Sequence, residues 1–256
     1  MKLVDVHCHL ESDEFADSLD LLLDRAERAG VVKLITCSIE PGQWPFSREL
    51  ASKYAVVEFA WGIHPWYIRK EDFGRIEDLR QSRDAGAVAI GEIGLDRRIE
   101  NPAFETQLAF FEAQMRIARD VNLPVIIHCR GAFNELALAL KKTGVPEAGG
   151  VVHSFAGSME VAAELARFNL SFSIGGILTY RSSRKRERML KSIYPDRFLL
   201  ETDSPDIPPV NAPSRINTPA NITLNLAAAA EILGVAIEEV AENTTANAAR
   251  IFGLKI

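Results

Sequence analysis

The sequence predicts an α/β fold built as a single (β/α)₈ barrel, or TIM barrel, with the active site at the C-terminal ends of its strands. Short apolar runs alternate with longer segments of helical periodicity, which is typical of a parallel sheet. Eight such runs occur in 256 residues, and eight parallel strands close a barrel in proteins of about 250 residues. No linker or repeat interrupts the chain, so we expect one domain over residues 1–256. An open doubly wound sheet is the alternative arrangement.

The expected strands are four to seven residues long and rich in Val, Ile, Leu and Phe, as strands buried on both faces are. In chain order they are Leu3–His7, Lys33–Cys37, Val56–Gly62, Ala87–Ile93, Pro124–Cys129, Gly150–His153, Leu170–Ile174 and Arg197–Glu201. Helical spacing predicts helices over Phe15–Ala29, Asn101–Val121, Pro219–Leu233 and Ile237–Phe252. The second of these has Asn101 as a candidate N-cap and Pro102 at the first helical position.

Composition excludes several classes of protein. Hydrophobic residues make up 47% of the chain and charged residues 25%, which is ordinary for a globular protein and not for a disordered or fibrous one. The 29 basic and 35 acidic residues leave a net charge of −6, unfavourable for coating long duplex nucleic acid. Three widely spaced cysteines indicate a reducing compartment. No signal peptide or membrane-spanning run is visible, so we expect a cytoplasmic protein that does not contact membranes.

All five histidines fall at or just past the C-terminal end of an expected strand. In a barrel, those strand ends form the active-site face. Two acidic residues, Glu92 and Asp203, lie at further strand ends. Histidine and carboxylate side chains are common metal ligands. We therefore expect a metal site formed by six side chains from five strands: His7, His9, Glu92, His128, His153 and Asp203.

The first strand carries Asp5-Val6-His7-Cys8-His9. Because strands have a period of two, we expect Asp5, His7 and His9 on one face and Val6 and Cys8 on the other. Two such imidazoles can bind one metal, and a neighbouring carboxylate can orient an imidazole. The motif alone also fits a purely structural histidine pair.

Glu92 lies inside an apolar run, where an unpaired carboxylate would cost several kcal/mol. Its two oxygens can bridge two cations; a buried salt bridge is the alternative. The same alternation places Glu201 one layer below Asp203. It also points His128 and Arg130 inward, and makes Cys8 and Cys129 core thiols. Ser154 is expected to point away from His153, and no nucleophile elbow or phosphate-binding loop is present, so a serine triad is disfavoured.

Together these motifs resemble the TatD family of metal-dependent hydrolases. The matching segments, in family order, are Asp5-Val6-His7-Cys8-His9, Gly62-Ile63-His64-Pro65, Gly91-Glu92-Ile93-Gly94-Leu95-Asp96, Ile127-His128-Cys129-Arg130, His153-Ser154-Phe155, Glu201-Thr202-Asp203-Ser204-Pro205 and Asn243-Thr244-Thr245-Ala246-Asn247-Ala248. The resemblance implies a TIM barrel, two divalent metal ions and hydrolysis of phosphodiester bonds in DNA, often as a 3′ to 5′ exonuclease on single strands.

The resemblance also implies roles for individual residues. His7, His9, Glu92 and Asp203 would bind one ion, and Glu92, His128 and His153 the second, with Glu92 bridging. The catalytic residues would be Asp203, which orients the attacking water, Glu92, and His64, which contacts the substrate phosphate. Imidazole with carboxylate suits Zn²⁺ and Mn²⁺, and carboxylates also accept Mg²⁺.

The chain departs from the family pattern around the substrate. Arg97 and Arg98 replace aromatic residues, Ser154 and Ala156 replace the commoner Cys and Ser, and the loop Asp206–Asn217 differs from the commonest form. Expected substrate contacts are His64, Arg97, Arg98, Arg130 and Arg184. Arg184 belongs to the basic segment Arg181–Lys191, which by itself also fits a solvated helix face.

The expected partner is single-stranded DNA or another phosphodiester, and no protein partner is identified. Two other functions remain open. One is a metal-dependent hydrolase of a small ester, amide or phosphoester. The other is a TatD-like subunit of a multi-protein complex for nucleic-acid processing or defence.

Overall fold

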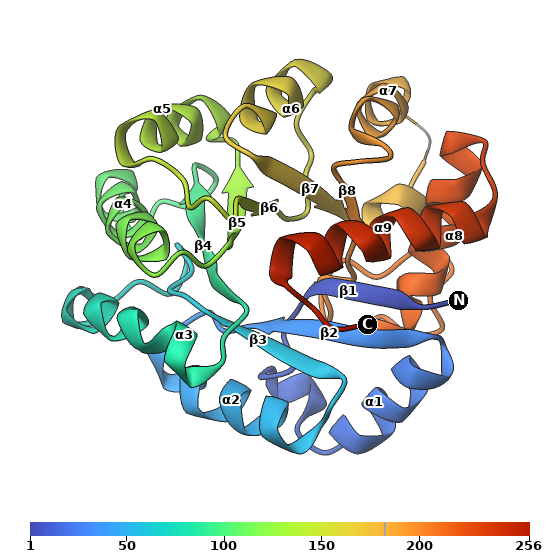
Figure 1. Ribbon diagram of the computed structural model, residues 1–256, viewed down its shortest axis with the longest axis horizontal. Coiled ribbons are helices and arrows are strands. Elements are labelled where there is room, and N and C mark those ends of the chain that lie inside the picture. The colour runs from blue at the N-terminus through green and yellow to red at the C-terminus, as the bar shows by residue number, and fades with distance from the viewer. Residues whose placement is uncertain (182) are drawn as a thin grey trace.

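Eight parallel strands form one sheet in the order β1 to β8 in the computed structural model, which describes residues 1–181 and 183–256 (Figure 1). The strands are β1 (Leu3–Cys8), β2 (Val31–Cys37), β3 (Val57–Trp61), β4 (Ala89–Asp96), β5 (Val125–Arg130), β6 (Gly150–Val152), β7 (Leu170–Ile174) and β8 (Phe198–Leu200). Because β8 also lies against β1, the sheet curves into a nearly closed barrel. The predicted TIM barrel is confirmed and the open sheet is excluded.

Helices surround the barrel and cover one of its ends (Figure 1). They are α1 (Leu19–Arg28), α2 (Trp44–Lys53), α3 (Ser82–Ala85), α4 (Phe104–Asp120), α5 (Phe133–Thr143), α6 (Met159–Ala166), α7 (Arg184–Ile193), α8 (Ile222–Leu233) and α9 (Ile237–Phe252). Short 3₁₀ segments lie at Asp13–Phe15, Pro41–Gln43, Lys70–Gln81, Gly176–Thr179 and Pro219–Asn221. Ser182, within the predicted basic segment, lies outside the described residues.

The hydrophobic core has two layers. Side chains on the outer face of the barrel, such as Phe59, Ile90 and Phe172, pack against the surrounding helices. Inward-facing residues, including Val4 and Ile126, form a second cluster.

Helix α9 completes the inner cluster, because its residues Ala248, Ile251 and Phe252 pack there. The same helix reaches chain segments that precede β1 and β8: Thr245 donates to the Lys2 carbonyl at 2.9 Å and Arg250 to the Asp196 carbonyl at 2.9 Å. It therefore closes the N-terminal end of the barrel and leaves the opposite end open.

Two predicted helix starts are wrong. Helix α4 begins at Phe104 with Ala103 as its cap; Asn101 is not the N-cap, because Pro102 lies in the preceding turn and accepts a hydrogen bond from Gln107 Nε2 at 2.9 Å. The helix expected from Phe15 begins at Leu19, because the chain first makes a 3₁₀ turn capped by Ser12.

Among the described residues, no single helix is long and apolar enough to cross a membrane. In the described residues, one pair of helices is long and apolar enough only when its two members are taken together. The pair is Pro219–Leu233 and Ile237–Phe252, and it is bent by 111°.

Candidate metal centre

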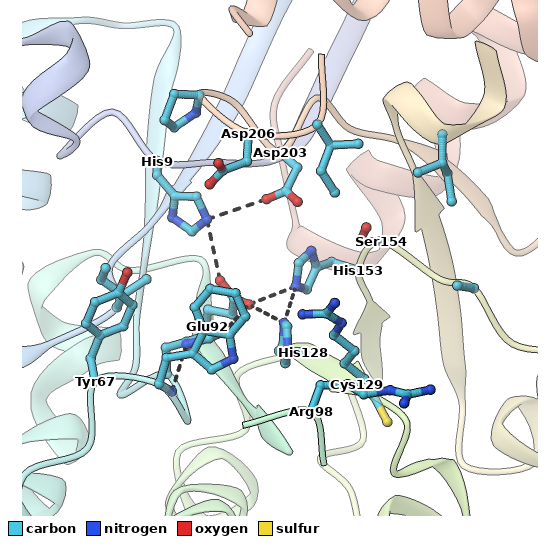
Figure 2. A pocket seen from close by; sticks show the side chains of 18 of the residues that line it. His9, Tyr67, Glu92, Arg98, His128, Cys129, His153, Ser154, Asp203 and Asp206 are labelled. Carbon is cyan, nitrogen blue, oxygen red and sulfur yellow. Dashed lines mark hydrogen bonds and ion pairs between the residues drawn. The ribbon is translucent and has the colours of Figure 1, made fainter. Parts of the chain in front are cut away.

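All six predicted ligands, together with His64, meet at the open end of the barrel. Figure 2 labels His9, Glu92, His128, His153 and Asp203 among them. His7, Glu92 and His128 lie within strands, His9 and His153 directly follow one, and His64 and Asp203 lie three residues past a strand end. Close approach is recorded in three overlapping groups: His7, His9 and Glu92; His7, His153 and Asp203; and His64, Glu92 and His128. Sequence reasoning therefore found every side chain of this cluster.

The alternation expected along the first strand is wrong in detail. Pairing between β1 and β2 shifts register between Asp5 and Cys8, which is the mark of a bulge. Val4 and Val6 both face the inner cluster, and Cys8 packs in the outer layer. In a regular strand His7 would point outward, because Val6 before it points inward. The bulge breaks this alternation, and the His7 ring also points inward, into the site.

Asp5 consequently bonds Thr202 rather than an imidazole ring. Its carboxylate accepts hydrogen bonds from the Thr202 N–H at 2.9 Å and the Thr202 hydroxyl at 2.5 Å. Asp203, the next residue, donates its N–H to the His7 carbonyl at 2.9 Å. Asp5 therefore anchors the segment that presents Asp203 to the site.

Glu92 is aimed into the site by a second irregularity. The register of β4 against β5 shifts between Ile90 and Ile93, so both isoleucines pack in the outer layer while Glu92 faces the histidines. Neighbouring glycines allow the close approach this needs. A Cβ on Gly94 would lie 2.0 Å from the His128 carbonyl oxygen, and one on Gly62 would lie 2.6 Å from that of Glu92.

The first donor set has four atoms: His7 Nε2, His9 Nε2, Asp203 Oδ1 and Glu92 Oε2. His7 Nε2 lies 3.2 Å from His9 Nε2 and 3.3 Å from Glu92 Oε2, and His9 Nε2 lies 3.5 Å from the same oxygen. Asp203 Oδ1 lies 3.4 Å from His7 Nε2 and 3.6 Å from His9 Nε2. Donors about 2.0–2.2 Å from a tetrahedral zinc ion are about 3.3–3.6 Å apart, so each of these five pairs is spaced as two ligands of one cation would be.

The second donor set surrounds the other oxygen of the same carboxylate (Figure 2). Glu92 Oε1 lies 2.8 Å from His153 Nε2 and 3.2 Å from His128 Nδ1, and those two nitrogens are 3.3 Å apart. Three protein donors fit a cation with a coordination position left open for water or substrate.

Hydrogen bonds on the far sides of two rings select the tautomer that a ligand needs. His9 Nδ1 donates to the Cys37 carbonyl at 2.8 Å, which leaves its Nε2 lone pair facing the first set. His128 Nε2 donates to Asp96 Oδ2 at 3.1 Å, which leaves Nδ1 facing the second set. Such outer partners fix ring orientation and raise ligand basicity.

His64 has the opposite arrangement. Its Nδ1 accepts the Trp66 backbone N–H at 3.1 Å, so the hydrogen of the neutral ring is on Nε2. Nε2 lies 3.1 Å from Glu92 Oε1. Burial lowers the pKa of His64, which keeps the ring neutral. A nitrogen that carries hydrogen is a donor and not a metal ligand.

The electrostatics favour charged carboxylates, whereas the imidazoles differ: acidic neighbours outweigh burial and raise the pKa of His7, His9 and His128, the last to about 9. Burial opposes the charge of Glu92, but the His64, His153 and His7 rings hold its pKa well below the usual range. Burial also opposes ionisation of Asp203, and hydrogen bonds from His7 and His9 outweigh it and lower the pKa of Asp203. Burial and the neighbouring His7 lower the pKa of His153 to about 4. The ionised carboxylates attract cations, and a bound cation would displace the protons of the imidazole rings that ligate it.

Two buried acids behind the cluster have supporting positions. Glu201 lies deeper than Asp203, as expected; it accepts the Ser154 N–H at 2.7 Å and the Ser173 hydroxyl at 2.5 Å, and burial raises its pKa to about 8. Asp96 was missed as a contributor. Its Oδ1 accepts the Arg98 N–H at 2.7 Å, and its Oδ2 accepts the Trp66 indole N–H at 2.7 Å. An acid directly after an apolar strand was the available signal.

The donor sets open into a cavity of about 960 Å³. Arg98 and Arg130 are among its lining residues, and so are the aromatic residues Trp66 and Tyr67, which are 43% and 41% exposed. Ser154 and Cys129 also line the cavity. Ser154 was expected to point away, but β6 ends at Val152 and strand alternation no longer applies to it.

Two predicted substrate residues do not line this cavity. The Arg97 guanidinium bonds Glu135 at 2.6 Å and lies over the Phe104 ring, 4.1 Å from its centroid. Arg184 is exposed at the start of α7.

Comparison with known proteins points to one family along nearly the whole chain. The model of the family described as TatD related DNase matches residues 4–253. The chain is 33% identical over 253 residues to the uncharacterized metal-dependent hydrolase YabD of Bacillus subtilis, covering 98% of each. It is 31% identical over 267 residues to the Danio rerio protein named "Putative deoxyribonuclease tatdn3", covering 99% of this chain and 98% of that protein. The crystal structure of YjjV, a TatD homolog of Escherichia coli, matches with a TM-score of 0.92 and 30% identity, covering 99% and 98% of the two chains.

Proposed function

The chain belongs to the TatD family of metal-dependent hydrolases, and from that premise we propose that it hydrolyses phosphodiester bonds in single-stranded DNA, progressing from the 3′ end. The observation that carries the proposal is the Glu92 carboxylate, whose two oxygens each belong to a separate donor set. That arrangement suits two cations about 3.5–4 Å apart, as in many phosphatases and nucleases.

The ions would be held by His7, His9, Asp203 and Glu92 on one side and by Glu92, His128 and His153 on the other. When bound, two such cations lower the pKa of water and stabilise charge on the phosphate oxygens. Zn²⁺ and Mn²⁺ match these donors, and Mg²⁺ is compatible with the carboxylates.

Two side chains of the protein, Asp203 and His64, would act on the attacking water and on the phosphate. Asp203 uses one oxygen, Oδ1, toward His7 and His9, and its other oxygen, Oδ2, would accept a proton from the attacking water. His64 would donate a hydrogen bond from Nε2 to a phosphate oxygen in place of the one toward Glu92 Oε1, while the ring keeps its proton. Both groups lie within hydrogen-bond reach of the donor sets, as these roles require.

Substrate recognition would use the rim of the cavity. Arg98 and Arg130 line it and suit phosphate oxygens, which guanidinium binds in a bidentate manner. Trp66 and Tyr67 present exposed aromatic surface, on which an unpaired base gains about 1–3 kcal/mol by stacking. Arg97, paired with Glu135, would act by its charge at the edge of this surface.

The proposal is tested with end-labelled single- and double-stranded DNA and RNA, each incubated with Mg²⁺, Mn²⁺, Zn²⁺ or EDTA. We expect metal-dependent shortening of single-stranded DNA from the 3′ end, abolished by EDTA. The variant Asp203→Asn, purified identically, must lose this activity, which excludes a contaminating nuclease. Cleavage of small esters or amides without cleavage of any oligonucleotide would contradict the proposal.

A further inference from the structure

The solvent face of α7 carries an unusual concentration of positive charge. The segment Arg181–Lys191 has six basic residues and one acidic residue in a chain of net charge −6. Arg184, Arg188 and Lys191 are exposed, and their spacing of four and three residues places them on one side of the helix. The opposite side is buried through Met189, Leu190 and Ile193.

These exposed cations have acids in their neighbourhood, because Lys185 contributes to the lowered pKa of Glu160, but ion pairs with such acids are lacking among the described residues. Within residues 1–181 and 183–256, Arg181, Arg184, Lys185, Arg188 and Lys191 form no ion pair. Basic residues on other helices do: Arg28 pairs with Asp24, Arg80 with Glu77 and Asp120, and Lys141 with Glu164. An ordinary solvated helix face mixes charges of both signs, and this one does not.

The start of α7 lies at the same end of the barrel as the cavity. The 3₁₀ segment Gly176–Thr179 leads from β7 toward α7, and its Ile177 lines the cavity. Tyr180 then donates its hydroxyl to the Pro208 carbonyl at 3.1 Å, and Ile207 beside Pro208 also lines the cavity. The contact between Tyr180 and Pro208 therefore joins the cavity rim to the basic segment.

A second hollow of about 270 Å³ is lined by residues of α7, of α8 and of the segment between β7 and α7. The two helices are neighbours in Figure 1. The lining of this hollow combines Tyr180, which is 38% exposed, with Arg181, Ser183 and Arg186, and with two acids, Glu187 of α7 and Glu231 of α8. Arg186 Nη1 donates to the Tyr180 carbonyl at 3.2 Å, which fixes the guanidinium at the wall. An aromatic ring beside guanidinium groups is the combination that single-stranded nucleic acids require.

We propose that α7 and this hollow form a second strand-binding surface, which holds the phosphate backbone of a single strand several nucleotides away from the bond being cleaved. The inference rests on the proposed function and adds a substrate class to it: strands long enough to reach from the cavity across Tyr180 to α7. The occupant is a polyanionic chain, because the surface offers a row of unpaired cations rather than one enclosed anion site.

The test compares two triple variants of equal charge. Arg181→Gln/Arg184→Gln/Arg188→Gln removes cations from the proposed surface and leaves Arg186, which bonds the backbone. The control Arg25→Gln/Arg48→Gln/Arg167→Gln removes three exposed arginines from α1, α2 and the end of α6. Binding of labelled single strands of about 4 and about 16 nucleotides is measured in EDTA by fluorescence anisotropy over a range of salt. Cleavage of the same strands and of bis(p-nitrophenyl) phosphate is measured with metal.

We expect the α7 variant to bind the long strand about tenfold more weakly at low salt and to lower the slope of log K against log salt by about 2, since each phosphate contact contributes about 0.7. The short strand, the small phosphodiester and the control variant should change less than about twofold. If both triple variants bind the long strand equally, the inference is overturned while the proposed function stands. If the native protein hydrolyses the small phosphodiester but neither binds nor cleaves any strand, the proposed function itself fails.

Discussion

The hydrogen on His64 Nε2 separates this residue from the other histidines of the cluster. His9 and His128 each donate from the ring nitrogen that faces away from the donor sets. His64 instead accepts a backbone N–H on its outer nitrogen and so presents a donor to the cavity. The same residue type therefore occupies two roles within one site, and the hydrogen-bond partner of the outer nitrogen decides which role applies.

Replacing His64 should separate catalysis from metal binding. His64→Ala is expected to lower kcat by about 10²–10³-fold, the usual contribution of a hydrogen-bond donor aimed at developing negative charge, with an unchanged metal content. Metal analysis of the purified variant beside its steady-state rate checks this. His9→Ala is the contrasting variant, which should lose metal. Loss of an ion from His64→Ala would assign His64 to the second donor set instead.

Asp96 holds three parts of the site with one carboxylate: the His128 ring, the Trp66 indole and the Arg98 backbone. Asp96→Asn removes the negative charge behind His128, so affinity for the second ion should fall about 10–100-fold. Titration with metal ions, monitored by calorimetry, measures this change in affinity. Asp84→Asn, an exposed aspartate on α3, should bind both ions as the native protein does. Equal affinities in the two variants would contradict the assignment of Asp96.

At the residue scale, the sequence predicted the cluster because histidine is rare in this chain and all five copies follow the strand pattern. It did not predict Asp96, because the partner of this carboxylate, His128, is 32 positions away. It also could not separate Arg98, which lines the cavity, from Arg97, which bonds Glu135. Pairing between distant side chains is set by the folded chain.

At the scale of elements, regular alternation predicted the strands well and failed where a strand is irregular. The register shifts in β1 and β4 each precede or contain a residue of the site, as β-bulges near active sites often do. One inserted residue reverses the face of everything after it. The expected shared face of Asp5 and His7 was wrong for this reason, whereas the expected face of His128, on β5, was right.

Helix α9 is the element that closes the barrel opposite the site, and Phe252 is one of its anchors, only 6% exposed. Phe252→Ala should lower the free energy of unfolding by about 3–5 kcal/mol, the cost of deleting a buried aromatic ring. Metal content should be retained, because α9 lies at the far end of the barrel. Chemical denaturation and metal analysis test both statements. A loss below about 1 kcal/mol would show that α9 does not seal this end.

At the scale of the whole molecule, the barrel divides stability and chemistry between its two ends. The N-terminal end is closed by apolar packing with α9, and the C-terminal end gathers buried carboxylates and imidazoles around an open cavity. The seven site residues are spread over about 200 positions of sequence. They could be recognised as one site because the C-terminal ends of all barrel strands meet at the same end of the barrel. Surface recognition depends on which rim residues pair with each other, and the sequence alone did not determine that.

The measurement that tests the central claim most directly is the number of divalent ions bound per chain, with activity, in the native protein and in Glu92→Gln. The amide keeps the size of the side chain but lacks the charge that both donor sets share. We predict two ions and metal-dependent hydrolysis in the native protein, and loss of at least one ion together with hydrolysis in Glu92→Gln. Native metal content and rate in this variant would contradict the account, because Glu92 would then be only a buried partner of the surrounding histidines.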